Sequence, residues 1–136
     1  VISERERQWQ GRIEGIARRL DPHEWARMRG RCDITVAPYD GPMYTACPSG
    51  IVLDAISSGI PAVTMAGTAS QYILEEFGMP AVLAEECTAK SVISATRKLI
   101  GDYGSYFARA QAARRMWGER NGPANWARAA LELYCR

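Results

Sequence analysis

Short apolar segments alternate with longer amphipathic segments through the middle of the chain. The apolar segments have the length of buried strands rather than of helices. The amphipathic segments carry apolar residues three and four positions apart, which is typical of helices packed on a core. The predicted strands are residues 33–37, 62–65 and 81–84. The predicted helices are residues 50–58, 70–77 and 89–100, the last with Thr88 as its N-cap.

Capping residues mark several helix ends. Asp21, Pro22 and Glu24 occupy the N-cap, N1 and N3 positions of a capping box, so a helix is predicted to begin at residue 22. Gly59 and Gly78 follow two of the predicted helices and suit the left-handed C′ position.

The two ends of the chain are predicted to be mainly helical. Residues 3–11 are charged and predicted helical, whereas residues 12–19 fit either a helix face or a weak strand. Helices at about 104–117 and 123–134 are predicted to close the chain. The last of these has an apolar stripe made of Trp126, Ala130, Leu133 and Tyr134.

Strands separated by helices imply parallel pairing with right-handed crossovers. The predicted fold is therefore α/β, a doubly wound, Rossmann-like parallel sheet in residues 1–104 with a helical tail in residues 105–136 of the same domain. Three or four strands are few for a complete sheet of this kind, and the sequence begins at Val1 rather than Met. We therefore expect a domain truncated at its N-terminus.

Charge is nearly balanced overall but unevenly distributed. The formal net charge of +2 leaves no basic excess of the kind that nucleic-acid binding requires. Residues 1–31 hold eight Arg and five acids (+3), residues 32–104 three basic and eight acidic residues (−5), and residues 105–136 six Arg and two Glu (+4). A basic face suits peripheral contact with anionic lipid or an acidic partner, and ordinary solvated helix surface is the alternative.

Cysteine and histidine usage points to no metal site. The four cysteines form no C-x-x-C pair and are interpreted as free thiols of a reducing cytoplasm, and the lone His23 has no partner nearby in sequence. No apolar run approaches the roughly 18 residues of a membrane-spanning helix. The expected location is the cytoplasm, including the inner face of the membrane if the basic surface binds lipid.

Residues 48–54 carry the strongest chemical signal. Ser49 is a suitable N-cap, and the free N–H groups at the start of the helix attract anions, phosphate above all. Asp54 is the single charge on the helix, and a carboxylate accepts two hydrogen bonds from a sugar diol. The pattern predicts half of a nucleotide-sugar site. The alternatives are a plain cap and turn for Ser49 and Gly50, and a helix-dipole role for Asp54.

Four sequence blocks resemble glycosyltransferases with the GT-B fold. Residues 20–38, with Cys32-Asp33-Ile34-Thr35-Val36-Ala37-Pro38, resemble their "a-D-v-x-v-x-P" block, and residues 48–63 resemble their "f-G-x-v-x-l-E-A-m-a-x-G-x-P-V-V" block. Residues 67–73 resemble the "g-g-x-x-E-x-i" turn, and residues 125–134 the closing "s-W-x-x-x-a-x-x-l-x-x-Y" helix. The blocks follow one another in the family's order, and the resemblance as a whole covers about residues 13–136. The retaining, family-4-like group (glycosyl transferases group 1) is resembled most.

The resemblance implies the donor-binding, C-terminal half of such an enzyme, which transfers a sugar from a nucleotide-sugar to a glycan or glycoconjugate. It implies that Ser49, Gly50 and Ile51 donate N–H groups to the diphosphate and that Asp54 binds the ribose hydroxyls. No metal or other cofactor is implied. Tyr39, Asp40 and Thr68, in loops that follow strands, are further candidates for the donor site, with plain surface loop as the alternative for the first two.

Two departures from the family pattern put catalysis by the parent protein in question. Ala46 stands eight residues before Asp54, where the family has an acid, and Gln71 stands where the turn has Glu. The basic pair that neutralises the leaving diphosphate is expected upstream of Val1, as is the acceptor domain, so no catalytic residue is assigned and this chain alone is expected to be inactive. The alternative function is a non-catalytic binding or assembly module. A homodimer through the last helix is a further expectation.

Overall fold

The computed structural model describes residue 16 and residues 18–134, with the backbone alone for residues 129, 130 and 132–134. It divides into two compact units. The N-terminal unit ends at Arg31 and the main unit begins at Cys32, and each is described by itself.

The N-terminal unit is built on helix α2 (Pro22–Arg29). The Asp21 carboxylate accepts from the amides of His23 and Glu24, while the Glu24 carboxylate accepts from the amide of Asp21. The predicted capping box is thus confirmed. The predicted helix at residues 3–11 lies outside the described residues, as does most of the ambiguous segment that follows it.

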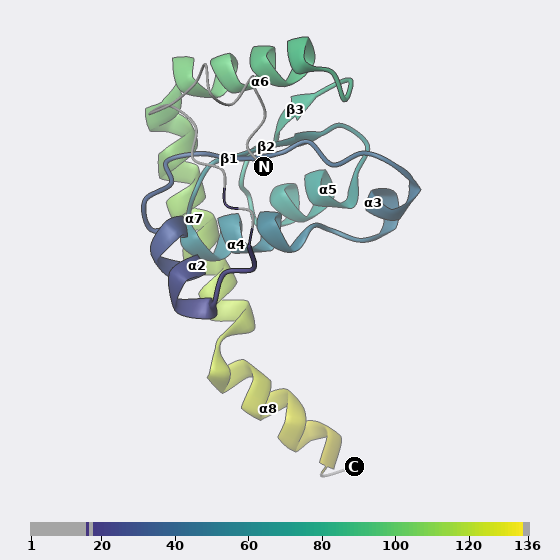
Figure 1. The fold of residues 1–136 in the computed structure, drawn as a ribbon. Coiled ribbons are helices and arrows are strands. Elements are labelled where there is room, and N and C mark those ends of the chain that lie inside the picture. Colours follow the sequence, from purple (N-terminus) through teal and green to yellow (C-terminus); the bar gives the residue numbers. More distant parts are fainter. Residues whose placement is uncertain (1–15, 17, 135–136) are drawn as a thin grey trace. The chain divides into compact units, whose positions relative to one another are not determined.

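The main unit contains a three-stranded parallel sheet, shown in Figure 1. Its strands, in spatial order, are β1 (Thr35–Ala37), β2 (Ala62–Met65) and β3 (Val82–Ala84). Val63 of β2 pairs with Val36 of β1 on one side and with Val82 of β3 on the other. The α/β class with a parallel sheet is confirmed. The described strands follow one another in the order β1-β2-β3, and the doubly wound arrangement stays a prediction.

Helices cover both faces of this sheet. Helices α4 (Gly50–Ser58), α5 (Ala69–Glu76) and α7 (Tyr103–Asn121) belong to the layer on one face, and α6 (Ala89–Gly101) covers the other (Figure 1). The first core includes Val52, Ile56, Leu74, Phe77, Ala110 and Ala113, and the second consists of Val63, Met65, Val82, Ala84, Ala95 and Leu99. β2 is buried along its whole length because it contributes side chains to both cores.

The end of α4 is fixed by a glycine. Gly59 has φ +71°, as the predicted C′ position requires, and its amide donates to the carbonyl of Ile56. The Gln111 amide of α7 donates to the Gly59 carbonyl at 3.0 Å. A Cβ atom at Gly59 would lie 2.7 Å from Gln111 Nε2, so α7 approaches this turn closely because there is no side chain.

Several elements differ from the predicted boundaries: β1 begins two residues and β3 one residue later than predicted. The β1–α4 loop contains a short helix, α3 (Pro42–Ala46), which begins after Gly41 at φ +106°. α7 runs to Asn121, four residues beyond the predicted end, and α8 (Pro123–Tyr134) follows after Gly122. Along the ranges given above, none of the helices is long and apolar enough to cross a membrane.

Candidate functional site

The candidate site lies where the strands of the main unit end. Because the three strands are parallel, their carboxyl ends share one edge of the sheet, and ligands of such sheets bind beyond that edge. Three loops meet there: residues 38–49, 66–68 and 85–88. The Cys87 thiol donates to the Pro38 carbonyl at 3.4 Å and so joins the third loop to the first.

A buried hydrogen bond joins the starts of α4 and α5. Ser49 is 8% exposed, and its amide donates to the Ser70 hydroxyl at 3.2 Å. Its carbonyl accepts from the amides of Val52 and Leu53, so Ser49 is the N-cap in backbone terms, although its hydroxyl makes no capping bond. The Ser49 amide, one of three predicted phosphate donors, is therefore already engaged by a neighbouring side chain.

The other two predicted donors begin α4. Gly50 and Ile51 are its first residues, and amides at such positions have no acceptor within their own helix. Gly50 is exposed, and a Cβ atom built on it would meet nothing within 4 Å. The space in front of this helix start is therefore open, and neither packing nor backbone conformation explains the absence of a side chain at Gly50.

Asp54 lies on the same face of α4 as Gly50. The two residues are four positions apart, which places them one above the other at a rise of about 6 Å. Asp54 is half-buried, whereas Val52 and Ile56 turn toward the core. A ligand with its phosphate at Gly50 would therefore extend along α4 toward Asp54.

The turn between β2 and α5 is held by its own side chains. The Thr68 hydroxyl donates to the Met65 carbonyl at 2.8 Å and is buried. Gln71 Oε1 accepts from the Gly67 amide at 2.9 Å, and Gln71 Nε2 donates to Glu75 at 2.9 Å. A glutamate at position 71 could accept the same bond from Gly67 but would repel Glu75, so the amide suits this chain.

The β1–α4 loop carries an aromatic pair that the sequence pattern did not indicate. The rings of Tyr39 and Tyr44 are stacked, with centroids 5.1 Å apart and planes inclined by 16°. Asp40 is exposed, and its carboxylate accepts from the Gly41 amide at 2.6 Å. Ala46 is exposed at the end of α3. The five-residue spacing of the tyrosines was the available signal, but no periodicity in a loop distinguishes such a pair.

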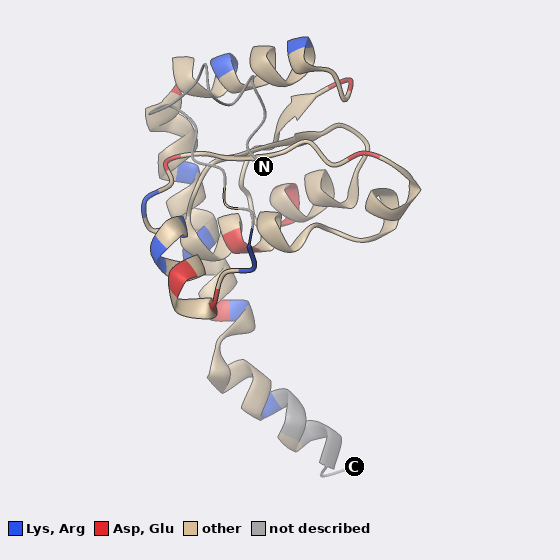
Figure 2. Ribbon diagram, in the orientation of Figure 1, with Lys and Arg blue, Asp and Glu red and all other residues tan. Residues whose placement is uncertain are grey.

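The charged side chains at this edge of the sheet are acidic. Asp40, Glu85 and Glu86 are exposed in the loops that follow β1 and β3, where Figure 2 shows the acidic positions. The three loops contain no Lys or Arg. Any anion held here would depend on backbone amides and the helix dipoles of α4 and α5 rather than on cationic side chains.

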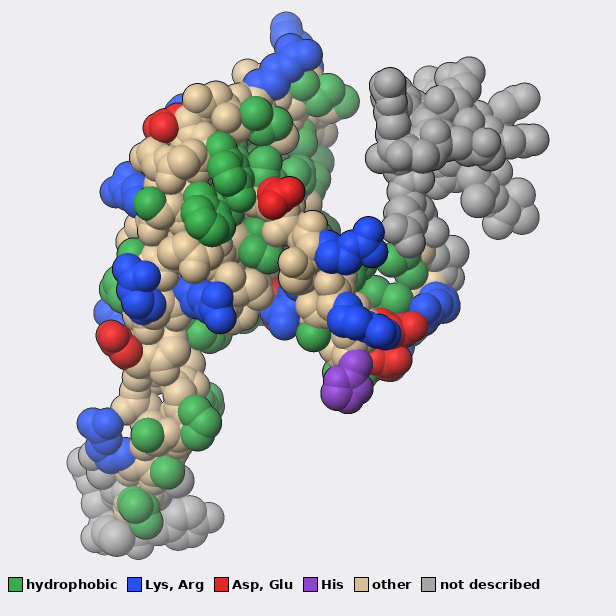
Figure 3. Space-filling model, turned by 90° about the vertical axis from the view of Figure 1, so that its left-hand side faces the viewer, with side chains coloured by type: hydrophobic (Ala, Val, Ile, Leu, Met, Phe, Trp, Pro, Cys, Tyr) green, Lys and Arg blue, Asp and Glu red, His purple; other side chains and the backbone are tan. Residues whose placement is uncertain are grey.

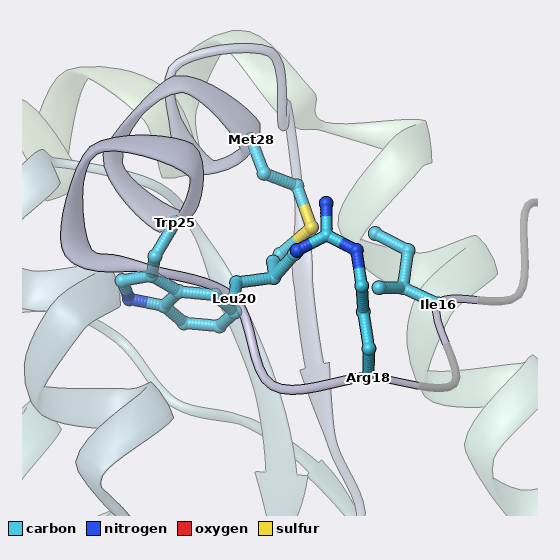
Figure 4. Close-up of a pocket in the computed structure, with 5 residues that line it drawn as sticks. All are labelled: Ile16, Arg18, Leu20, Trp25 and Met28. Carbon is cyan, nitrogen blue, oxygen red and sulfur yellow. The ribbon is translucent and has the colours of Figure 1, made fainter.

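A pocket of about 330 Å³ lies in the N-terminal unit and contains none of the predicted site residues. Figure 4 shows the five residues that line it, Ile16, Arg18, Leu20, Trp25 and Met28, with the Arg18 side chain between Ile16 and Met28. Arg18 makes a two-point ion pair with Glu24 at 2.6 and 2.7 Å. These bonds, with a further one from the Asp21 amide, lower the pKa of Glu24 to about 2.

Within the described ranges no three His, Cys, Asp or Glu side chains are grouped so as to hold a metal ion. Comparison of the chain with protein-family profiles, curated proteins and solved structures finds no match. The assignment to a class of proteins therefore depends on the motifs and on the geometry of this edge.

Proposed function

We propose that the main unit is the donor-binding part of a glycosyltransferase that transfers a sugar from a nucleotide-sugar to a glycan or glycoconjugate. Gly50 and Ile51 donate their amides to the diphosphate, and Asp54 accepts hydrogen bonds from the ribose hydroxyls. Tyr39 and Asp40 border the donor from the β1–α4 loop. Thr68, whose buried hydroxyl donates to the Met65 carbonyl, holds the turn beside it.

One observation carries this proposal: the starts of α4 and α5 are joined at the carboxyl edge of a parallel sheet by the bond from Ser49 to Ser70. Two helix starts side by side concentrate unpaired amides and the positive ends of two dipoles. The open space at Gly50 and the carboxylate four residues further along α4 match the spacing of a phosphate and an adjacent sugar.

Titration of the isotope-labelled chain with UDP or GDP tests the proposal. We expect amide signals of Gly50, Ile51 and Asp54 to shift, with a dissociation constant near 1 mM, because ~4 kcal/mol is a reasonable binding energy for half a cleft. Shifts confined to α7 and α8 would contradict the proposed placement.

Gly50→Ala sharpens this test. The new methyl group would meet nothing in the folded chain, yet it would stand in front of the amides that the phosphate approaches. We expect stability to be kept and affinity to fall about tenfold, or ~1.4 kcal/mol. Gly104→Ala is the matched control, because Gly104 is also helical with open space around it and lies far along the chain in α7.

The second candidate function is a non-catalytic binding or assembly module. Ala46 and Gln71 favour it, because neither position supplies the acid of the resembled family. The acidic rim of Asp40, Glu85 and Glu86 also favours it, since it weakens attraction for a dianionic leaving group. A chain that fails to bind any nucleotide diphosphate at millimolar concentration would support this second function.

A further inference from the structure

Helix α6 carries every basic side chain found between residues 32 and 104. These side chains are Lys90, Arg97 and Lys98, and the eight acids of the same range all lie outside the helix. Figure 2 shows basic positions along α6 and acidic positions on the elements around it. α6 is therefore a basic surface on a part of the chain whose net charge is −5.

Exposed apolar side chains share the outer side of α6 with these cations. Ile93 is 51% exposed and Ile100 is 58% exposed, whereas Ala95 and Leu99 of the same helix are buried with side chains of β2 and β3. Figure 3 shows hydrophobic and basic side chains next to one another at the top of the view, where α6 lies. The helix thus has a core stripe and a second apolar surface that the described elements leave uncovered.

The cations and the isoleucines alternate along one line. Four exposed residues form this outer stripe: Lys90, Ile93, Arg97 and Ile100. Their spacings of three, four and three residues keep them within about 80° of arc on a helix of about 3.6 residues per turn. Lys98 stands at the border of the stripe, about 80° round the helix from Lys90. Positive charge and apolar surface are therefore presented in the same direction.

The positive charge of α6 is available to an outside partner. No acidic side chain of the described residues forms an ion pair with Lys90, Arg97 or Lys98. Exposed charges attract a partner of opposite sign over about 8 Å at physiological salt. The partner that suits this surface is therefore anionic.

The shape of the outer stripe favours a lipid bilayer over a protein as that partner. It lies on the convex side of a helix of 13 residues, which is about 20 Å long and about 10 Å wide. A stable protein interface covers about 800 Å² on each partner, roughly four times that area. A bilayer surface takes up single apolar side chains among its headgroups and needs no matching groove, and anionic headgroups attract the neighbouring Lys and Arg.

We propose that α6 binds the surface of an anionic lipid bilayer. Ile93 and Ile100 enter the headgroup region, while Lys90, Arg97 and Lys98 contact the negatively charged headgroups. The helix then lies in the plane of the membrane, as interfacial helices do. α4 and α5 pack on the other face of the sheet, so lipid binding by α6 needs none of the donor-site residues.

Co-sedimentation of the 136-residue chain with vesicles tests the charge of this surface. We expect binding to phosphatidylcholine vesicles with about 30% phosphatidylserine and little binding to phosphatidylcholine alone. Arg97→Glu should lower the partition coefficient at least about tenfold, because each basic charge near the surface contributes about fivefold and the reversal removes one and adds its opposite. Arg115→Glu is the matched control, since it makes the same change at an exposed position of α7, on the other face of the sheet, and should cost less than about twofold.

Ile93→Ser tests the apolar part of the contact without changing the net charge. We expect the partition coefficient to fall about threefold, because one apolar side chain no longer enters the headgroup region. Tyr72→Ser is its control, because Tyr72 is 61% exposed on α5 and should not touch the membrane.

Three results would overturn the proposal. A chain that does not sediment with anionic vesicles has no lipid-binding surface. Equal losses in Arg97→Glu and Arg115→Glu would mean that binding follows the overall charge of the chain rather than α6. An Ile93→Ser chain that binds as tightly as the natural one would mean that α6 recognises charge alone and does not enter the bilayer.

Discussion

Asp54 combines a half-buried position on α4 with a place on the same face as Gly50. If its carboxylate binds the ribose, Asp54→Ala should weaken binding of UDP or GDP by ~1–3 kcal/mol, the range for a lost hydrogen bond to a charged group. Calorimetry measures the affinity, and thermal unfolding of the same sample should show little change. Unfolding of the variant would instead make Asp54 a structural residue.

The low pKa of Glu24 predicts how the stability of the start of α2 depends on pH. Its pKa falls from an ordinary value of 4.5 to about 2, chiefly through the hydrogen bonds from Arg18 and then through the Asp21 amide. Because the folded value lies below the unfolded one, this carboxylate stabilises the start of α2 above pH 4.5, and the contribution is lost as pH falls toward 2.

An NMR titration that follows the carboxyl signal of Glu24 measures the pKa of this residue directly. We expect a midpoint near 2 in the natural chain and a clear rise toward the ordinary value in Arg18→Met, which removes the ion pair. A midpoint of 4 or above in the natural chain would mean that the pair with Arg18 is not formed in solution.

Among the helix ends, Gly59 is a position where one methyl group should cost stability in two ways, through backbone strain and through packing. Gly59→Ala forces a left-handed backbone on a residue with Cβ and brings that atom to 2.7 Å from Gln111 Nε2. We expect a loss of ~2–4 kcal/mol in the free energy of unfolding, from strain and disturbed packing together.

Gly78→Ala is the matched control for this loss. Gly78 has φ +68°, but a Cβ atom there would meet nothing within 4 Å, so only the backbone strain of ~1–2 kcal/mol should remain. Denaturant unfolding gives the loss in the free energy of unfolding for each variant. The difference between the two losses is the contribution of α7 packing on the turn after α4. Equal losses would show that Gln111 moves aside without cost.

The elements that sequence could predict are those with clear end signals. α4 and β2 have the predicted bounds because Gly59 stops the helix and Pro61 separates it from a fully apolar strand. α3 was not predicted, since a five-residue helix has too few turns for an apolar period to be seen. Thr88 caps α6 as predicted, since its hydroxyl accepts from the Ser91 amide. Both ends of α5 and the C-terminal end of α6 differ by one residue from those predicted, as is usual for helix termini.

At the scale of the whole molecule, we expect the 136-residue chain to show neither sugar transfer nor donor hydrolysis. The three loops at the candidate site contain no cationic side chain to stabilise a departing diphosphate, and that stabilisation is commonly the largest catalytic term. Release of UDP or GDP from a panel of nucleotide-sugars is the measurement. Turnover that Asp54→Ala abolishes would contradict this expectation.

The candidate site was only partly predictable. Sequence placed Ser49, Gly50 and Asp54 on one helix start because Ser-Gly before an apolar helix is a local signal. It could not show that the Ser49 amide is taken by Ser70, since that bond joins residues 21 positions apart. The stacking of Tyr39 on Tyr44 was likewise invisible, because it depends on the short helix that turns the loop back.

The parallel sheet also determines how the main unit can fold. Thr35 pairs with Ala62, and Val63 pairs with Val82, so each strand pairing closes a loop that contains a whole helix. Closing such a loop costs chain entropy before any contact between the strands compensates for it. The sheet therefore forms more slowly than a β-hairpin of equal size, whose strands are joined by a short turn. Strands and crossover helices must therefore form together, and a nascent chain that ends within α4 has no partner for β1.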